Sequence, residues 1–350
     1  ETINFDGMGG NDIVILTGTS GVENVSTRPG EVTFEGSNFT VNATDVEDVT
    51  VDGKGGVDVA ELRDSAGSDS LVMQVDKTTL IGPGFSSKVV KFETVHVYAS
   101  AGVDEAKLYD TDGNDVFTST PEFVRMEGNG FMHRAKNFRY AHGYSSDGND
   151  VAEMHDSDGN DKFKHYKGQS KMFGGGFYVR AKNFPEVNAI ADEGGNDYAR
   201  IFDSSSVDKF VGTPTMARMY STEADYDVTT ELFEKVLTYS RNGGDDIARF
   251  YDTNDKEIFV GKKAKAQYYN GDFEIIARKF AKVEATSTPG SNDVAKLYDT
   301  LGNDHLVATE ESAKLYEMVG DDMNLLYEAF AFDHVKARRS EGSDTKDVAD

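Results

Sequence analysis

Short segments in which apolar and polar residues alternate occur throughout this chain. In one of them, the apolar residues Ala106 and Leu108 flank the charged residue Lys107. An alternation with a period of two is typical of a β-strand that has one buried side and one side in water. We therefore predict strands in which Ala106, Leu108 and their equivalents point inward.

The alternating pattern returns about every 46 residues. An aspartate at the end of a glycine-rich turn marks each repeat, and successive landmarks are 46, 46, 46, 47, 49 and 47 residues apart. The landmark residues of repeats one to seven are Asp12, Asp58, Asp104, Asp150, Asp197, Asp246 and Asp293. The repeats begin near residues 9, 55, 101, 147, 194, 243 and 290. Self-similarity at this period predicts that residues 1–350 form a single tandem-repeat array. Because the chain begins in mid-repeat, we also expect it to be a segment of a longer protein.

Apolar residues recur at fixed offsets from each landmark. Alanine stands two residues after it in six repeats: Ala60, Ala106, Ala152, Ala199, Ala248 and Ala295. Thirteen residues after it come Leu71, Phe117, Phe163, Phe210, Phe259 and Leu306. We predict about five short strands per repeat, with helices conceivable only at 230–237 and 324–332. Insertions around 221–229 and 317–326 are expected to be protruding loops, since insertions within a repeat usually map to loops.

Columns of similar residues at a fixed period are typical of an all-β fold of the β-solenoid type, similar to a parallel β-helix. In that fold, coils stack in parallel and each buried residue lies above its counterpart. Known solenoid repeats have about 20–29 residues, so a 46-residue repeat predicts two coils. The alternative is a seven-bladed β-propeller, because propeller blades also have about 40–50 residues.

The charge of the chain excludes several partners. The chain has 62 acidic and 36 basic residues, a formal net charge of −26, and no cysteine. Such a chain repels nucleic-acid phosphates and anionic lipid surfaces, so we expect no nucleic acid as a partner. No apolar run has the 18 or so residues that span a bilayer, so we expect no membrane insertion. The absence of cysteine excludes disulfides, zinc–thiolate sites and a cysteine nucleophile.

Two further acidic positions follow the landmark. Six residues after it stand Asp64, Asp110, Asp156, Asp203, Asp252 and Asp299, and eleven residues after it stand Glu23, Asp69, Asp115, Asp161, Asp208, Glu257 and Asp304. Two turns add a third acid between these positions, Asp112 and Asp158. Alternating carboxylates around a glycine resemble the first half of a calcium loop. We therefore predict Ca²⁺ at two sites, whose residues are Asp110, Asp112, Asp115, Asp156, Asp158 and Asp161. The alternative is that Asp and Asn simply cap tight turns.

Other chemical candidates are weaker. The chain has no Gly-x-Ser-x-Gly elbow, HExxH motif or nucleotide loop, so we expect no enzyme and no catalytic residue. The basic segments 134–136 and 180–182 are expected to pair with acids on a neighbouring coil. The histidines and the tyrosines are where catalysis or glycan binding would be sought: His96, His133, His142, His155, His165, Tyr140, Tyr144, Tyr166 and Tyr178.

The consensus GND-x-A-x-L-Y-D-x-x-G-N-D-x-F, followed by G-x-G-F-x-x-R-A-K-x-F-x-x-V, runs through nearly the whole chain. It resembles the tandem repeats of very large secreted or surface proteins of planctomycete-type bacteria. The Gly-Asn-Asp turns alone resemble RTX-type calcium repeats, although the RTX unit is a nonapeptide. The first resemblance implies an extracellular or cell-surface location.

We therefore expect a non-enzymatic structural region, such as a surface layer, a matrix component or an adhesin stalk. Its expected partners are neighbouring repeats or further copies of the chain. The alternative is a module that binds or degrades polysaccharides, since parallel β-helices host such enzymes, and glycans would then be its partners.

Overall fold

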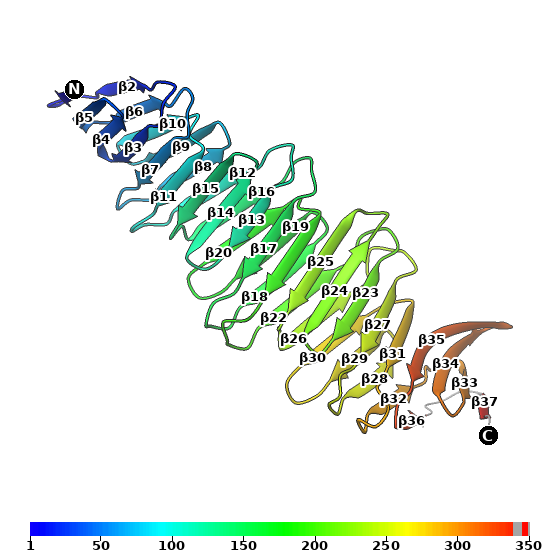
Figure 1. Ribbon diagram of the computed structural model, residues 1–350. Coiled ribbons are helices and arrows are strands. Elements are labelled where there is room, and N and C mark those ends of the chain that lie inside the picture. Colours follow the sequence, from blue (N-terminus) through cyan, green and yellow to red (C-terminus); the bar gives the residue numbers. More distant parts are fainter. Residues whose placement is uncertain (339–344, 349–350) are drawn as a thin grey trace. The chain divides into compact units, whose positions relative to one another are not determined.

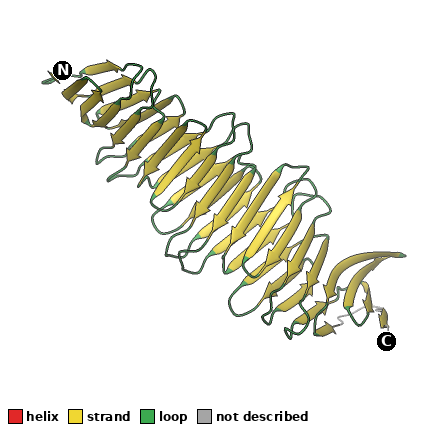
Figure 2. Cartoon of the chain, in the orientation of Figure 1, coloured by secondary structure: helices red, strands yellow, loops and turns green. Residues whose placement is uncertain are grey.

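The computed structural model describes residues 1–338 and 345–348. The chain divides into two compact units. The N-terminal unit comprises Glu1–Ser157 and Gly168–Val187, and the C-terminal unit comprises Asp158–Lys167 and Asn188–Asp350. Every regular element in the described residues is a β-strand (Figure 2). Those residues contain no helix with the length and apolar character needed to cross a membrane.

The strands of the N-terminal unit are short (Figure 1). They are β1 (Thr2–Asp6), β2 (Ile13–Thr17), β3 (Asn24–Arg28), β4 (Gly30–Gly36), β5 (Phe39–Val46), β6 (Asp48–Asp52), β7 (Val59–Arg63), β8 (Ser70–Gln74), β9 (Lys77–Gly82), β10 (Phe85–Val90), β11 (Thr94–Tyr98), β12 (Glu105–Tyr109), β13 (Val116–Ser119), β14 (Phe123–Gly128), β15 (Phe131–Lys136), β16 (Tyr140–Tyr144), β17 (Val151–His155), β19 (Gln169–Phe173) and β20 (Tyr178–Lys182).

Strand β21 (Glu186–Ile190) begins in the N-terminal unit and ends in the C-terminal unit. The strands of the C-terminal unit are β18 (Lys162–Tyr166), β22 (Tyr198–Phe202), β23 (Lys209–Thr213), β24 (Met216–Ser221), β25 (Tyr226–Glu231), β26 (Lys235–Tyr239), β27 (Ile247–Tyr251), β28 (Ile258–Lys262), β29 (Lys265–Tyr269), β30 (Glu274–Arg278), β31 (Lys282–Thr286), β32 (Val294–Tyr298), β33 (Asn303–Ala308), β34 (Ser312–Val319), β35 (Asp322–Phe330), β36 (His334–Arg338) and β37 (Thr345–Val348).

Repeats one to three and five to seven each contribute two single strands and one three-stranded antiparallel meander. In repeat three, β12 is a single strand, β13, β14 and β15 form the meander, and β16 is the second single strand. The meander lies in one sheet, whereas β12 and β16 pair with each other in the second sheet. The meander of repeat two, β8 to β10, lies in that second sheet as well. Successive repeats therefore place their meanders in opposite sheets.

Both units use this arrangement. In the N-terminal unit, one sheet runs β1-β5-β4-β3-β7-β11-β15-β14-β13-β17 and the other runs β2-β6-β10-β9-β8-β12-β16-β20-β19. In the C-terminal unit the meanders of repeats five, six and seven alternate between sheets in the same way. Each unit is thus a β-solenoid, as predicted, and not a propeller, because the strands of consecutive repeats share two continuous sheets.

The stacking distance along the chain differs from the prediction. Glu105 of β12 lies opposite Tyr140 of β16, and Thr94 of β11 lies opposite Met132 of β15, so parallel partners are 35 and 38 residues apart. The expectation of two coils in each 46-residue repeat is therefore wrong. Equivalent residues of successive repeats do not lie above one another, because successive repeats exchange sheets.

The core consists of the predicted columns. The six alanines two residues after the landmarks are fully buried, as are Leu71, Phe117, Phe210 and Phe259. Aromatic side chains join the columns, for example Phe117 and Phe184, whose ring centroids are 5.7 Å apart. Leu306 is the exception, since it is only partly buried. The alternation of the sequence thus identified the inward side of almost every strand.

Both proposed helices are strands, and the insertions extend hairpins. Residues 230–237 fall in β25 and β26, and residues 324–332 begin within β35. The first insertion is a turn whose flanking residues Ser221 and Tyr226 are paired. In the second, β34 and β35 pair as far as Val319 and Asp322 (Figure 1). The loop prediction is therefore wrong for 317–326, because the added residues continue the ladder and satisfy their backbone groups there.

Candidate functional site

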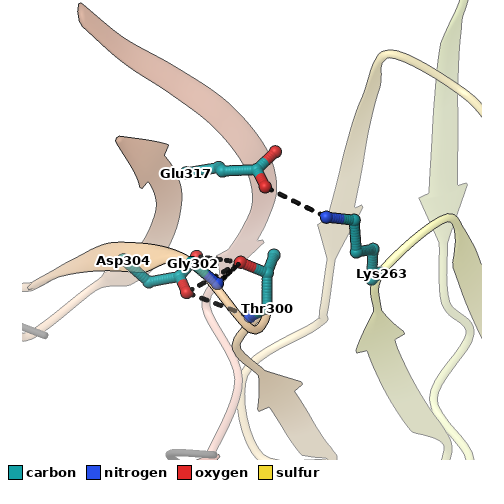
Figure 3. A network of polar contacts seen from close by, with 5 residues as sticks. All are labelled: Lys263, Thr300, Gly302, Asp304 and Glu317. Atoms are coloured by element: carbon teal, nitrogen blue, oxygen red, sulfur yellow. Dashed lines mark hydrogen bonds and ion pairs between the residues drawn. The ribbon is translucent and has the colours of Figure 1, made fainter. Parts of the chain in front are cut away.

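The acid eleven residues after each landmark closes a tight turn. In repeat seven, the backbone N–H and the hydroxyl of Thr300 donate to Asp304, and the N–H of Gly302 donates to Thr300 Oγ1 (Figure 3). Nearby, Lys263 Nζ lies 3.1 Å from Glu317 Oε1 (Figure 3). The same turn occurs in repeat three, where Thr111 donates to Asp115 through its N–H and its hydroxyl. Buried carboxylates in these turns therefore replace water as hydrogen-bond acceptors.

The landmark aspartate binds the backbone of the preceding repeat. The N–H of Asp69 donates to Asp104 Oδ1 at 2.8 Å, and the N–H of Asp115 donates to Asp150 Oδ1 at 2.7 Å. In the C-terminal unit, the N–H of Glu257 donates to Asp293 Oδ1 at 2.6 Å. Each pair is 35 or 36 residues apart in the chain. A charged acceptor makes these bonds stronger than bonds between neutral groups.

The acid six residues after the landmark caps a turn of the next repeat. Asp110 accepts from the N–H of Ser146 at 2.7 Å and from its hydroxyl at 2.9 Å. Asp252 accepts from the N–H and hydroxyl of Thr288 at 2.6 and 2.7 Å. All three acidic positions of a repeat therefore have a structural role.

These positions bring three carboxylates together at several places in the described residues. Each carboxylate offers one oxygen, and the three oxygens lie within 4.8 Å of one another. We name each group after its landmark residue. The N-terminal unit contains the Asp104 group (Asp64, Asp69, Asp104) and the Asp150 group (Asp110, Asp115, Asp150), and the C-terminal unit contains the Asp246 group (Asp203, Asp208, Asp246) and the Asp293 group (Asp252, Glu257, Asp293). Carboxylate oxygens at this spacing can hold a metal ion, and hard cations prefer such ligands.

Burial and mutual repulsion alter the acidity of these groups. Burial raises the pKa of Asp110 to about 6, and the charge of Asp150 adds to the rise. Burial, followed by the charge of Asp293, raises the pKa of Glu257 to about 7. The pKa of Asp69 and that of Asp104 are also raised, mainly by burial. The fully charged groups are thus unfavourable until a proton or a cation offsets the repulsion.

The residues predicted to bind Ca²⁺ lie in different surroundings. Asp110 and Asp115 belong to the Asp150 group, but Asp112 is exposed and is not part of it. Asp158 is exposed as well, whereas Asp156 and Asp161 are buried. The N–H of Asp161 donates to Asp197 Oδ1 at 2.7 Å. The calcium prediction chose these two turns because they contain the additional acids Asp112 and Asp158, and these are the two side chains that point into solvent.

The landmark aspartates are members of the groups that the acid-rich turns alone did not indicate. The spacing of the acids could have indicated them. The acid eleven residues after one landmark precedes the next landmark by 35 residues when the repeat has 46, and 35 residues is also the distance between parallel strand partners. Adjacent carboxylates therefore come from different offsets of successive repeats. Equivalent landmark acids of successive repeats therefore do not form one column.

The basic segments interact mainly with tyrosine. An Arg180 guanidinium nitrogen donates to Tyr144 Oη at 2.8 Å, and the equivalent Arg134 nitrogen lies 3.4 Å from Tyr98 Oη. Only Lys136 of these segments has an acidic partner among the described contacts, Glu122 at 3.5 Å. The expectation that both arginines pair with acids of a neighbouring coil is therefore wrong. Their planar guanidinium groups lie beside aromatic rings instead.

The candidate histidines are mostly core residues. His133 and His165 are buried, and burial lowers the pKa of His133 to about 4 and that of His165 to about 3. His142 lies 3.2 Å from Glu105, and burial lowers its pKa to about 4. Burial likewise lowers the pKa of His96. His155 is half-buried at the end of β17.

The candidate tyrosines stack on neighbouring strands. Tyr144 stacks on Tyr109 with ring centroids 4.7 Å apart, and Tyr140 lies against Tyr178 at 5.9 Å. Tyr166 belongs to the C-terminal unit, where it stacks on Phe202 at 4.5 Å.

Comparison with known proteins gives no homologue: no family model matches the chain, and no curated protein matches it either.

Proposed function

We propose that this chain is a non-enzymatic structural region of an extracellular or cell-surface protein, such as a stalk or a matrix component. The observation that carries the proposal is the repetition of one hydrogen-bonded unit. Equivalent acids close the turns of repeats two, three, five and six, and landmark acids bind the preceding repeat in both units. Residues that recur in this way are accounted for by folding, and a stack of such units extends simply by adding repeats.

The location is tested by labelling intact cells of the source organism with an antibody against the chain. We expect labelling without permeabilisation, and loss of the epitope when intact cells are treated with protease. Labelling that requires permeabilised cells would contradict an extracellular role. Purified chain is expected to show no activity in polysaccharide lyase assays.

Calcium stabilisation forms part of the proposal. Groups of three carboxylates occur in both units, and the chain carries a net charge of −26, so divalent ions would stabilise the folded chain more than the unfolded chain. A thermal melt in millimolar Ca²⁺ is expected to show a higher midpoint than a melt in EDTA. Sodium chloride at matched ionic strength is the control, because an equal shift in sodium would indicate general screening instead of binding.

Glycan binding is the second candidate function. It is favoured by Tyr140, which is 38% exposed and lies against Tyr178 on the surface of the N-terminal unit. A glycan array tests it. A hit that Tyr140→Ala removes would support this function, whereas a hit unchanged by that substitution would argue against this surface.

A further inference from the structure

The carboxylate groups differ in their neighbours, although they share the same backbone scheme. In repeats two to five and in repeat seven, the column on the second meander strand carries Leu80, Met126, Met172, Met219 or Leu315. Repeat six carries Tyr268 there. Repeat six also has Glu257 where repeats two to five have aspartate, and Asn270 where repeats two to four have glycine. In an array built from equivalent units, such a concentration of differences singles out the Asp293 group.

The Asp293 group contains a buried carboxylate oxygen with no hydrogen-bond partner. Glu257 is fully buried. Its Oε1 accepts from the hydroxyl of Thr253 at 3.2 Å and from Asn270 Nδ2 at 3.5 Å, whereas its Oε2 has no partner. A carboxylate oxygen without a donor inside a protein is unfavourable, because it loses its hydration and gains no hydrogen bond in return. This oxygen is therefore available to a ligand that enters the group.

The hydroxyl of Tyr268 is the second buried polar atom without a partner. Tyr268 is fully buried on β29, opposite Phe259 of β28. It lies two residues before Asn270, so both side chains project on the side that reaches Glu257. The charges of Glu257, Asp252 and Asp293 add to burial in raising its pKa, as expected for a hydroxyl close to all three. Two unpartnered oxygens thus occur beside one carboxylate group.

The Asp104 group provides the contrast. Both carboxylate oxygens of Asp69 accept from the hydroxyl of Ser65, at 3.1 and 2.9 Å, and the column residue is the apolar Leu80. None of its three carboxylates has a buried oxygen without a partner. The Asp150 and Asp246 groups each contain one such oxygen, Asp115 Oδ1 and Asp246 Oδ2, but their column residues Met126 and Met219 carry no hydroxyl.

We propose that the Asp293 group, with the hydroxyl of Tyr268, is a binding site for a single hard divalent cation of the Ca²⁺ or Mg²⁺ type. This site rests on the cation stabilisation proposed above and goes beyond it by assigning the ion to one group. Three carboxylates and a hydroxyl supply only oxygen ligands, which hard cations require, and Ca²⁺ takes six to eight of them with water completing the shell. The ion accepts electron density from Glu257 Oε2 and separates the three like charges.

The test uses Tb³⁺ as a luminescent substitute for Ca²⁺ on the full chain. The chain contains no tryptophan, so tyrosine is the sensitiser of Tb³⁺ emission. We expect a saturable signal that Ca²⁺ competes away, and a strong loss of that signal in Tyr268→Phe. Calorimetry with Ca²⁺ measures affinity separately, so that loss of sensitisation is distinguished from loss of binding.

The decisive variants are matched pairs. Glu257→Gln and Asp293→Asn are expected to weaken Ca²⁺ binding at one site about tenfold or more, a change of about 1.4 kcal/mol. Asp69→Asn and Asp104→Asn are expected to leave that site unchanged. Circular dichroism melts identify variants that do not fold. If an acidic variant does not fold, Tyr268→Phe, which keeps the shape of the core residue, is used to measure the loss of Ca²⁺ affinity.

Three results would overturn the proposal. One is the absence of saturable Ca²⁺ or Mg²⁺ binding, and another is unchanged affinity in Glu257→Gln. The third is an equal loss of affinity in both matched pairs, which would indicate that cations associate with all acidic groups alike. A failure of this kind leaves the cell-surface location unaffected, because antibody labelling tests it separately.

Discussion

The Asp104 group and the Asp293 group show how one backbone scheme accommodates two chemistries. In both, the landmark aspartate accepts the N–H of the acid eleven residues after the previous landmark. In the Asp104 group that acid is Asp69, and the turn residue facing it is Gly82, where an added Cβ would lie 1.7 Å from Asp69 Oδ1. In the Asp293 group the acid is Glu257 and the corresponding turn residue is Asn270. The two groups thus differ in both the length of the acid and the side chain at the facing turn residue.

The largest expected effect comes from adding a side chain to the turn of repeat two. Gly82→Asn forces a Cβ against the buried Asp69 and Phe85, which should lower the free energy of unfolding by about 3 kcal/mol. Adding Asp69→Glu reproduces the combination found in repeat six and should restore about 1 kcal/mol or more. Urea denaturation of the single and double variants measures this coupling. Strictly additive effects would show that the acid and the turn residue are independent.

A buried histidine extends the comparison to another core column. Fifteen residues after the landmark, repeat two has Met73, repeat six has Gly261 and repeat four has His165, whose ring stacks on Tyr226. Burial lowers the pKa of His165 from its ordinary value of 6.5 to about 3. Its contribution to stability is therefore present above pH 6.5 and is lost as the pH falls toward 3, by about 1.4 kcal/mol per pH unit.

His165→Met should remove this contribution to the pH dependence. Between pH 6.5 and pH 5, the free energy of unfolding of the variant is expected to fall by about 2 kcal/mol less than that of the unsubstituted chain. Urea denaturation at several pH values measures the difference. The exposed His334, replaced by Met, is the control. Parallel pH profiles for the unsubstituted chain and His165→Met would contradict the prediction.

Replacing each central acid by its amide should change stability in opposite directions. In EDTA, Glu257→Gln places an amide donor beside Asp252 and Asp293 and should raise the free energy of unfolding by about 1 kcal/mol. Asp69→Asn turns an acceptor of the Ser65 hydroxyl into a donor and should lower it by about 1 kcal/mol. Melts of the two variants in EDTA test the difference in sign, and a change of the same sign in both would remove the distinction between the groups.

The smallest expected effect concerns two buried tyrosines of the C-terminal unit. In EDTA, Tyr268→Phe removes a hydroxyl without a partner and should raise the free energy of unfolding by about 0.5 kcal/mol. Tyr327 is the matched control, because its hydroxyl donates to the carbonyl oxygen of Lys262, and Tyr327→Phe should lower stability by about 1 kcal/mol. Equal changes would indicate that the Tyr268 hydroxyl has a partner in solution.

Much of the fold follows from local pattern, because alternation reports directly which side of a strand is buried. Ala106, Leu108 and Phe117 were assigned to the core on that basis, and all three are fully buried. The exchange of sheets between repeats could not be read in this way. It depends on which strand each meander joins, and the local pattern is the same in either sheet. The expected two-coil repeat failed for this reason.

The acidic sites were predicted in part. Density of charge drew attention to Asp112 and Asp158, yet the side chains that meet are those turned inward by the strands beside them. The partnership of Asp115 with Asp150 depends on a distance of 35 residues between parallel strands, which the 46-residue period conceals. The importance of Tyr268 became apparent only with its burial and its unpartnered hydroxyl.

The exchange of sheets has a consequence for how such a gene can change. The last strands of each repeat pair in register with the first strands of the next repeat. This pairing is the same whichever sheet contains the meander of the next repeat. Recombination that deletes or duplicates one repeat therefore preserves every strand pairing downstream. Within one unit, it nevertheless moves the surface residues of the later repeats to the opposite face. Gain or loss of repeats in pairs leaves those faces where they were, so lineages that depend on one face should vary in length by even numbers of repeats.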